Sequence, residues 1–384
     1  MKAIIIGAGM GGASAGIALR NVGYQTEIYE AVTDIKPVGA AISIWPNGVK
    51  CLNFLGLGPQ IKALGGDMAT MAYADYRTGR ILTRFPLRPL VERVGEFPYP
   101  TARAELQAML LDEFGRERVF LNKRLTRIED NGSQVTAWFA DGSAAIGDLL
   151  IGADGTHSLA RDYVLGHRVA RRYAGYVNWN GLVAVDEDIA PANQWTTFVG
   201  QGKRVSLMPV AGRRFYYFFD VPLPKGLEQE RGRAREDLRE YFSGWCAPVQ
   251  RLITQLDPLG VNRVEIHDIE PFSTFTRGRV ALLGDAAHST TPDIGQGGCA
   301  AMEDAVVLAL ALRTHSLGIE DALLRYQEKR VERVRSLVLK ARKRCDITHG
   351  KDPQATRRWY QDLENETGEN ILTGLADTIL GGPL

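Results

Sequence analysis

The fold is decided by the stretch Lys2-Ala-Ile-Ile-Ile-Gly7-Ala-Gly9-Met-Gly11-Gly12-Ala13. In it, a short apolar run ends in the pattern Gly-x-Gly-x-x-Gly, and a helical pattern follows at once. A second apolar run then stops at an acid, Glu30. A strand, a glycine turn, a helix and a strand that ends in an acid about 20 residues after the glycines are typical of a dinucleotide-binding unit.

Each part of this unit has a physical role. Gly7 allows the tight turn, Gly9 leaves room for a pyrophosphate, and Gly12 lets the helix pack closely on the strand. The N-terminus of the helix offers free N–H groups and a partial positive charge to phosphates. Glu30 can accept hydrogen bonds from both ribose hydroxyls and would repel a 2′-phosphate, which predicts a dinucleotide of the FAD or NAD kind.

Two other interpretations fit part of the segment. Ala13-Ser14-Ala15 resembles a signal-peptide cleavage site, but a strand that ends at Glu30 has no place in an export signal. The other alternative is a glycine-rich helix that packs on a strand and binds nothing. The glycines alone do not exclude it, whereas the flanking elements and Glu30 favour dinucleotide binding.

Composition limits the class of protein. A chain of 384 residues predicts about two domains. The net charge of +1 gives no general attraction to nucleic acid or to an anionic membrane, and no apolar run has transmembrane length without glycine interruption. The four cysteines form no C-x-x-C pair and predict reduced thiols in a cytoplasmic protein. The six histidines show no ligand spacing, so we expect no metal site.

The chain changes character in its middle. Apolar and aromatic β-formers dominate from Arg171 to Val221, which predicts an antiparallel sheet inserted into an α/β chain. The nucleotide-binding domain is therefore expected to be discontinuous. The other expected elements are a helix over 49–57 that ends at Gly58-Pro59, a hairpin over 71–84, a helix with Thr101 as N-cap, strands over 119–126, 135–139, 144–151 and 280–283, and long helices over 300–345.

Two further segments narrow the dinucleotide to FAD. The apolar strands before Gly152-Ala-Asp154-Gly155 and before Gly284-Asp285 both stop at glycine and aspartate, where strand ends open onto a ligand crevice. Asp285 can hold a polyol hydroxyl, and the glycines of 295–298 let the chain pass flat against a planar ring. The helix that starts near Gly298 directs its positive end at that ring, which stabilises the negative charge of a reduced flavin.

These three segments resemble the single-component FAD-dependent aromatic hydroxylases, the para-hydroxybenzoate hydroxylase-like group. The resemblance covers at least residues 1–345 and implies that Arg103 contacts the flavin nucleotide and that Asp154-Gly155 serves both FAD and a visiting nicotinamide cofactor. Cys299 departs from the family, which often has Asn there, and this puts one polar contact near the ring in doubt. The predicted FAD-binding residues are Gly7, Gly9, Gly11, Gly12, Glu30, Ala31, Ser43, Arg103, Leu125, Asp154, Asp285, Gly295, Gln296, Gly297, Gly298 and Cys299.

The expected fold class is α/β. We expect a Rossmann-like FAD-binding domain of the glutathione-reductase kind, an inserted antiparallel β-sheet domain for the substrate, and C-terminal helices. The predicted parts are residues 1–72, 101–170 and 277–345 for the FAD-binding domain, 73–100 and 171–276 for the substrate domain, and 346–384 for a peripheral helical segment.

A narrower resemblance is to bacterial members of this family that hydroxylate urate. Four stretches carry it, namely residues 37–50, 173–183, 194–200 and 290–299. It implies that NADH reduces the flavin, that O2 adds at flavin C4a, and that the hydroperoxide hydroxylates C5 of urate to give 5-hydroxyisourate. It also implies that Asn178, Arg204 and the Tyr216-Tyr217 pair bind urate. NADH would visit the FAD domain transiently, since there is no second Gly-x-Gly-x-x-Gly unit.

Strand alternation refines these roles. Alternation places Arg204, Ser206 and Met208 on one face, where the guanidinium can form charge-assisted hydrogen bonds to a planar anion. Alternation alone leaves a structural Arg204 open, and the resemblance favours a functional one. Tyr216 and Tyr217 point to opposite faces, so one of them reaches the pocket. We expect Arg204 and Tyr216 to be the catalytic residues.

Structural roles are expected for several other polar residues. His288 is predicted to be a loop hydrogen-bonder and His267-Asp268 to lie at the surface. Asp293 is expected to flank a helix, and hydrogen bonding near the substrate stays open for it. The run 340–344 is predicted to be a solvated helix end, and an apolar stripe that begins at Leu324 to be packed.

Two other functions remain open from the sequence. One is an FAD-dependent hydroxylase of a phenolic acid such as salicylate or a hydroxybenzoate, since Arg204 would serve a carboxylate equally well. The other is a flavoprotein that binds a ligand without catalysis.

Overall fold

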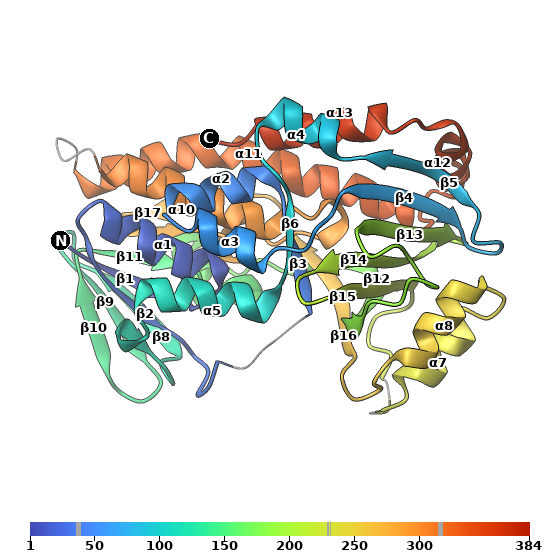
Figure 1. Ribbon diagram of the computed structural model, residues 1–384. Coiled ribbons are helices and arrows are strands. Elements are labelled where there is room, and N and C mark those ends of the chain that lie inside the picture. Colours follow the sequence, from blue (N-terminus) through green and yellow to red (C-terminus); the bar gives the residue numbers. More distant parts are fainter. Residues whose placement is uncertain (36–39, 229, 231, 314–317) are drawn as a thin grey trace.

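A six-stranded sheet carries the glycine turn (Figure 1). The computed structural model describes residues 1–35, 40–228, 230, 232–313 and 318–384, so residues 37–39 of the first resemblance stretch lie outside the described residues. The strands are β1 (Lys2–Ile6), β2 (Gln25–Tyr29), β3 (Ala41–Ile44), β4 (Thr70–Asp75), β5 (Ile81–Pro86), β6 (Tyr99–Ala102), β7 (Val119–Phe120), β8 (Leu125–Asp130), β9 (Val135–Phe139), β10 (Ala144–Gly147), β11 (Leu149–Gly152), β12 (Arg171–Ala184), β13 (Gln194–Gly200), β14 (Lys203–Val210), β15 (Arg214–Pro222), β16 (Asn262–Ile269), β17 (Thr276–Arg277) and β18 (Val280–Leu282).

Helices join and cover these strands. The α-helices are α1 (Met10–Asn21), α2 (Pro46–Phe54), α3 (Gly58–Leu64), α4 (Arg88–Val94), α5 (Arg103–Phe114), α6 (Leu159–Leu165), α7 (Ala234–Tyr241), α8 (Ala247–Gln255), α9 (Asp285–His288), α10 (Gly297–Leu312), α11 (Ile319–Thr348), α12 (Pro353–Asn365) and α13 (Glu369–Leu380). Short 3-10 turns are η1 (Arg116–Arg118), η2 (Gly155–His157) and η3 (Pro292–Ile294). None of the helices in the described part of the chain has both the length and the apolar character needed to cross a membrane.

The six-stranded sheet has the order β17-β18-β11-β1-β2-β7 and is parallel except for β17. Its central strands are buried apolar runs, as parallel strands covered on both faces must be. The register aligns Ile6 of β1 with Gly152 of β11, and Gly152 with Leu282 of β18. The loops after these strands therefore leave the sheet at one edge, where an open α/β sheet binds its ligand.

A second, seven-stranded sheet has the order β16-β12-β15-β14-β13-β4-β5. The predicted antiparallel sheet is present, with one correction: β4 joins it parallel to β13. One face is covered by α7 and α8, which bury an aromatic and aliphatic core that includes Tyr217, Phe219 and Trp245 (Figure 1). The opposite face carries the polar side chains of the site.

The C-terminal helices are less peripheral than predicted. Ala376 and Ile379 of α13 are buried in one apolar cluster with Trp45 and Met208. Figure 1 shows α13 beside α4, far from it in sequence. The predicted helical segment 346–384 is confirmed as helical, but α13 completes a core that it shares with the seven-stranded sheet, α4 and α10. The predicted division of the chain into domains stays a prediction.

Several predicted boundaries were wrong for tertiary reasons. The expected strand over 144–151 is two strands in different sheets, because the backbone N–H of Lys2 donates to the Asp148 carboxylate at 2.6 Å while Asp148 N–H donates to Lys2 O at 2.8 Å. The expected strand over 119–126 is likewise divided between β7 and β8. Gly58-Pro59 begins α3 instead of only ending α2, since proline is accepted in a first helical turn.

Other corrections concern side chains. Thr101 lies in β6 and its hydroxyl donates to Tyr99 O, so it does not cap α5. Leu324 is exposed, while Val334, Val338 and Ala341 of the same stripe are buried. The run 340–344 lies inside α11 and not at a solvated helix end: Lys340, Arg342 and Arg344 contact neighbouring elements, while Lys343 is exposed.

Candidate active site

Three segments that are far apart in sequence meet at the carboxyl edge of the six-stranded sheet. A Cβ on Gly7 would lie 2.3 Å from Ala153 O, and a Cβ on Gly11 would lie 2.8 Å from Leu283 Cδ1. The buried Arg161 donates to Ala286 O at 3.2 Å and to Thr156 O at 2.9 Å. The glycine turn, the Asp154 segment and the Asp285 segment therefore form one site, and Arg161 is a connecting residue that sequence reasoning missed.

The glycine turn has the geometry that a dinucleotide requires. Gly7 has φ +106°, and a Cβ on Gly12 would lie 2.0 Å from Gly7 O, so neither position accepts a side chain. A Cβ on Gly9 would meet no atom within 4 Å, which leaves its backbone open to a pyrophosphate. The Glu30 carboxylate accepts from Ala8 N–H at 2.8 Å, which holds it beside the turn.

The two aspartates of the other segments differ in what they contact. The Asp154 carboxylate accepts from Leu159 N–H at 2.8 Å and from Ala160 N–H at 3.1 Å, so it anchors the start of α6. Burial raises the pKa of Asp154. The Asp285 side chain is exposed at the start of α9, and no described residue is seen to donate to its carboxylate. Asp285 is therefore the aspartate that can receive a polyol hydroxyl.

The N-terminus of α10 faces this edge with unfilled donors. None of the described side chains caps α10 or α1, so the first-turn N–H groups of both helices can serve an anionic or electron-rich ligand. The Cys299 thiol is directed at Ser43 O, 3.8 Å away, and burial raises its pKa to about 12. Its side chain thus holds β3, and only the backbone of Cys299 is left for a cofactor. The Ser43 hydroxyl contacts Met208 Sδ at 3.4 Å.

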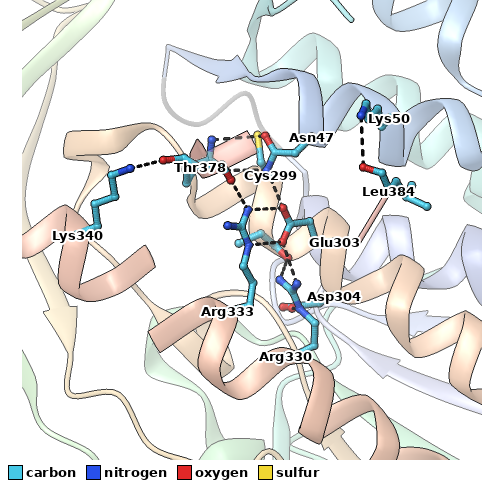
Figure 2. Close-up of polar contacts among 12 residues, drawn as sticks. Asn47, Lys50, Cys299, Glu303, Asp304, Arg330, Arg333, Lys340, Thr378 and Leu384 are labelled. Atoms are coloured by element: carbon cyan, nitrogen blue, oxygen red, sulfur yellow. Dashed lines mark hydrogen bonds and ion pairs between the residues drawn. The ribbon is translucent and has the colours of Figure 1, made fainter. Parts of the chain in front are cut away.

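A buried ionic cluster fixes α10 in place (Figure 2). The Arg330 guanidinium of α11 donates to Asp304 Oδ1 at 2.6 Å and to Glu303 Oε2 at 2.8 Å, and Arg333 donates to Glu303 Oε1 at 2.9 Å. Arg333 also donates to Thr378 O at 2.8 Å, which ties α13 to the cluster. Burial raises the pKa of the Asp304 carboxyl, but His288 and Arg330 lower it by more, to about 2.

The cluster reaches the predicted flavin loop through one amide. Asn47 Nδ2 donates to Glu303 Oε1 at 2.7 Å and to Gln296 Oε1 at 2.8 Å. His288 lies 2.6 Å from Asp304 Oδ2, so the expected hydrogen bonding is confirmed, although His288 lies in α9 and not in a loop. Gln296, which precedes α10, is therefore held by the same contacts that hold the helix.

The polar face of the seven-stranded sheet presents the predicted substrate residues together. Register pairs Arg204 with Asp220, Ser206 with Phe218 and Met208 with Tyr216 across β14 and β15, so these residues share a face. Tyr217 is buried in the opposite apolar core, as alternation predicted.

The Arg204 guanidinium is held by two acids. Its Nε donates to Asp220, and its Nη2 donates to Asp293 Oδ1 at 3.1 Å. It also lies over the Phe218 ring, 5.1 Å from the centroid. Burial lowers the pKa of Arg204, but Asp220 and Asp293 raise it by more, so the guanidinium stays charged.

The other two predicted substrate residues adjoin Arg204. Asn178 Nδ2 donates to Asp220 Oδ1 at 2.6 Å, so Asn178 and Arg204 share one carboxylate. Tyr216 is half-buried, and its pKa is raised by burial and by Asp220 while Arg204 and Arg103 lower it. The structure thus brings the three predicted residues to one place, and their roles toward a substrate stay predictions.

Sequence reasoning missed two residues of this network, favoured another role for a third, and misjudged one residue outside it. Asp220 was not identified, although an acid in the apolar strand Phe218-Phe219-Asp220 is itself a signal of a buried charge. His349 gave no sequence signal. Asp293, for which a helix-flanking role was favoured and hydrogen bonding near the substrate was left open, accepts from Tyr176 OH at 3.0 Å as well as from Arg204. Asp268, expected at the surface, is buried between Arg172 and Arg342.

The remaining predicted cofactor residues lie around the same edge or behind it. Arg103 is the exposed first residue of α5, and its backbone N–H donates to Ala40 O at 3.2 Å. Ala31 follows β2, while Leu125 of β8 packs into the main core. These positions do not show whether Arg103, Ala31 and Leu125 contact a cofactor, so their roles in FAD binding stay predictions.

One group of residues has the composition of a cation site. Ligand atoms of Asp293, Cys345 and His349 lie within 4.8 Å of one another. The guanidinium of Arg204 already occupies Asp293 Oδ1, and the Cys345 thiol is directed at Ala174 O. A divalent cation would have to displace or approach a fixed positive charge, so the arrangement favours an ion-pair network over a metal site.

Comparison with known proteins defines the class. The family model described as FAD binding domain matches residues 1–341, and the chain belongs to this family. The predicted α/β fold and the FAD cofactor are confirmed. The open backbone at Gly9, the free Asp285 carboxylate and the uncapped helices fit that cofactor.

Within the family, the chain is similar to FAD-dependent urate hydroxylases. It is 62% identical to the enzyme of Klebsiella pneumoniae over 384 residues, which is the whole of both chains, and 57% identical to that of Mycolicibacterium vanbaalenii, covering 100% of this chain and 98% of that one. The crystal structure of Klebsiella pneumoniae HpxO complexed with FAD and uric acid matches with a TM-score of 0.98, 62% identity and coverage of 100% and 97%. The R204Q variant of HpxO, also complexed with FAD, matches with a TM-score of 0.98 at 61% identity and covers 100% of this chain and 99% of that chain.

Proposed function

We propose that this chain is an FAD-dependent urate hydroxylase, a monooxygenase that uses NADH and O2 to hydroxylate urate at C5 and yields 5-hydroxyisourate. One observation carries the proposal: a chain 62% identical over its full length to urate hydroxylases keeps Asn178, Arg204 and Tyr216 on one polar face. The HpxO structure in the same family is a complex with FAD and uric acid.

FAD, when bound, supplies the redox chemistry and the activation of O2. The residues of this chain bind and orient. Gly9 and the N-terminus of α1 receive the pyrophosphate, Asp285 receives a polyol hydroxyl, and the N-terminus of α10 faces the ring. Arg204 donates to the oxygen and nitrogen acceptors of urate, and Tyr216 orients its plane by its hydroxyl.

The surroundings of Arg204 favour urate over a phenolic acid. Asp220 and Asp293 already contact the guanidinium, and a substrate carboxylate has no N–H group to donate to these two buried acids. Urate presents N–H groups that carboxylates accept, as well as acceptors for the guanidinium. The alternative of a non-catalytic flavoprotein is disfavoured by the presence of both the cofactor edge and the polar face.

The test uses FAD-loaded protein with NADH and a panel of urate, salicylate and 3-hydroxybenzoate. We expect urate alone to accelerate NADH oxidation and to give 5-hydroxyisourate, identified by mass spectrometry before it decays. Repeating the assay with NADPH tests the choice of nicotinamide. Hydroxylation of an aromatic acid without any product from urate would overturn the proposed substrate, and the absence of product from every compound would overturn the proposed activity.

The same proposal includes a cytoplasmic location. It is supported by Cys51, Cys246, Cys299 and Cys345, which are all free thiols and all buried.

A further inference from the structure

His349 extends the network around Arg204 by one ring. His349 Nε2 lies 3.3 Å from Asp293 Oδ1, the same oxygen that accepts from Arg204 at 3.1 Å. The imidazole stacks on Tyr176 with 3.7 Å between ring centroids, and Tyr176 OH donates to the other oxygen of Asp293. Asp293 therefore connects the guanidinium to a histidine at the end of α11.

The side chains of this network are buried. The side chains of Asp220 and Asp293 are 0% exposed, that of His349 is 2% exposed, and that of Arg204 is 11% exposed. Charges in such surroundings are screened little by water, so their balance decides which ligands can enter.

The charge balance of the free cluster is negative. One guanidinium faces two carboxylates, and with a neutral imidazole the cluster carries a single net negative charge. Burial raises the pKa of Asp293, but Arg204 and His349 lower it by more, so this carboxyl stays ionised. An anionic substrate beside Arg204 would double the net negative charge unless a proton entered with it.

The other groups around His349 do not supply that charge. On α11 its neighbour Cys345 is a thiol whose pKa burial raises, and Asp346 is paired with Lys351 at 3.0 Å. On β12 Tyr176 is a phenol whose pKa burial raises well above the usual value. His349 is thus the side chain of this cluster that can hold an added proton as a positive charge.

The imidazole is arranged to accept a proton. Because Nε2 faces a carboxylate oxygen, the neutral ring carries its hydrogen there and donates it to Asp293. Nδ1 is buried and has no hydrogen-bond partner among the described residues. It is therefore the free basic nitrogen of the network, and one proton on it restores the charge that a bound anion removes.

We propose that Asp293 and His349 are positioning residues for Arg204, and that His349 takes up one proton when an anionic substrate binds beside Arg204. The inference rests on the proposed function, since it uses urate as that anion. It assigns a role at the site to the C-terminal end of α11, which lies more than 140 residues beyond Arg204 in the sequence.

The proton is counted by isothermal titration calorimetry. Urate is titrated into oxidised, FAD-loaded protein in two buffers of different ionisation enthalpy, at several values between about pH 6 and pH 9. We expect the wild-type protein to take up protons on binding, with the number largest at the pH where the ring is neutral in the free protein and protonated in the complex. We expect His349→Gln, which keeps a donor for Asp293, to take up none.

A matched variant controls for the substitution itself. His267→Gln makes the same chemical change on β16, where the ring contacts Glu265 O, and should leave the proton count as in the wild type. In turnover assays His349→Gln should raise the KM for urate about tenfold at alkaline pH, with the FAD content unchanged. A merely structural histidine would instead lower FAD content or yield without altering the pH profile.

The outcomes separate the two proposals. Urate binding by the wild type without proton uptake, or with uptake that His349→Gln retains, would overturn this inference and leave the proposed function intact. No binding heat from urate would overturn the proposed substrate and this inference with it. If His349→Gln fails to fold, the absence of proton uptake by the wild type still overturns the inference.

Discussion

Removing the Arg330 guanidinium should destabilise the protein through α10. Arg330 is 2% exposed and donates to Glu303, to Asp304 and to Ala300 O at 3.2 Å (Figure 2). In Arg330→Met the aliphatic volume is largely kept, but two buried carboxylates lose a shared cation. Removing one partner of a buried ion pair costs about 3–5 kcal/mol.

The structure places the expected loss at the lower end of that range. Glu303 keeps Arg333 and Asn47, and Asp304 keeps His288, so neither carboxylate is left alone. We therefore expect a loss of about 3 kcal/mol in the free energy of unfolding. Weaker FAD binding should accompany it, since the N-terminus of α10 faces the cofactor.

The assay is a urea titration followed by circular dichroism at one fixed FAD concentration, because bound ligand adds to apparent stability. Arg335→Met is the matched control: it lies on the same helix in an exposed pair with Glu332, where the guanidinium side chain is 57% exposed. Such pairs contribute at most about 1 kcal/mol. If both variants lose the same small amount, the cluster does not stabilise α10 and the reasoning is refuted.

Three other changes test the cofactor edge and the same cluster. Gly12→Ala should abolish FAD binding, because the added Cβ would lie 2.0 Å from Gly7 O. Gly374→Ala is the control and should retain FAD, because its Cβ would meet nothing within 4 Å. The flavin absorbance of the purified proteins measures the difference. Asp285→Ala should weaken FAD binding about tenfold or more in equilibrium dialysis, because a charged hydrogen bond is worth about 1.5–3 kcal/mol. Little loss of stability should accompany it. An unchanged affinity for FAD would contradict the contact between Asp285 and a polyol hydroxyl. The pKa of Asp304 is lowered to about 2 in the folded protein, so its carboxylate contributes stability above the pKa of the unfolded chain, and this stability is lost as the pH falls through the folded value. Lowering the pH through this range should therefore reduce the free energy of unfolding of the wild type by about 2 kcal/mol more than that of Asp304→Asn. Equal acid sensitivity of the two proteins in urea titrations would argue against this ionisation.

The elements that the sequence predicted well are those with a local physical cause. The need for glycine at Gly12 comes from Gly7 O, five residues away, and Asp154 and Asp285 follow buried strands whose ends the fold places at one edge. The predicted opposite orientation of Tyr216 and Tyr217 is confirmed because alternation is a property of one strand.

The errors arose where partners come from distant segments. The strand break at Asp148 depends on its hydrogen bonds to Lys2, and the burial of Asp268 depends on Arg172 and Arg342. Neither contact can be predicted from the residues that flank Asp148 or Asp268 in the sequence. His349 is the clearest case, since a single histidine near the end of a long polar helix gives no sign that it will meet Asp293.

The main effect of Asp220 and Asp293 on Arg204 is to fix the orientation of its guanidinium. A buried ion pair is a weak source of stability, because desolvation offsets much of the Coulomb attraction and apolar residues of similar volume often serve as well. Asp220 and Asp293, however, receive different nitrogens of one guanidinium, which fixes the plane of the group as well as its position. A planar substrate must lie in that plane to be bound by the remaining N–H donors. The cost of this fixed geometry is an excess of negative charge, and a histidine in contact with Asp293 is where a compensating proton can be held.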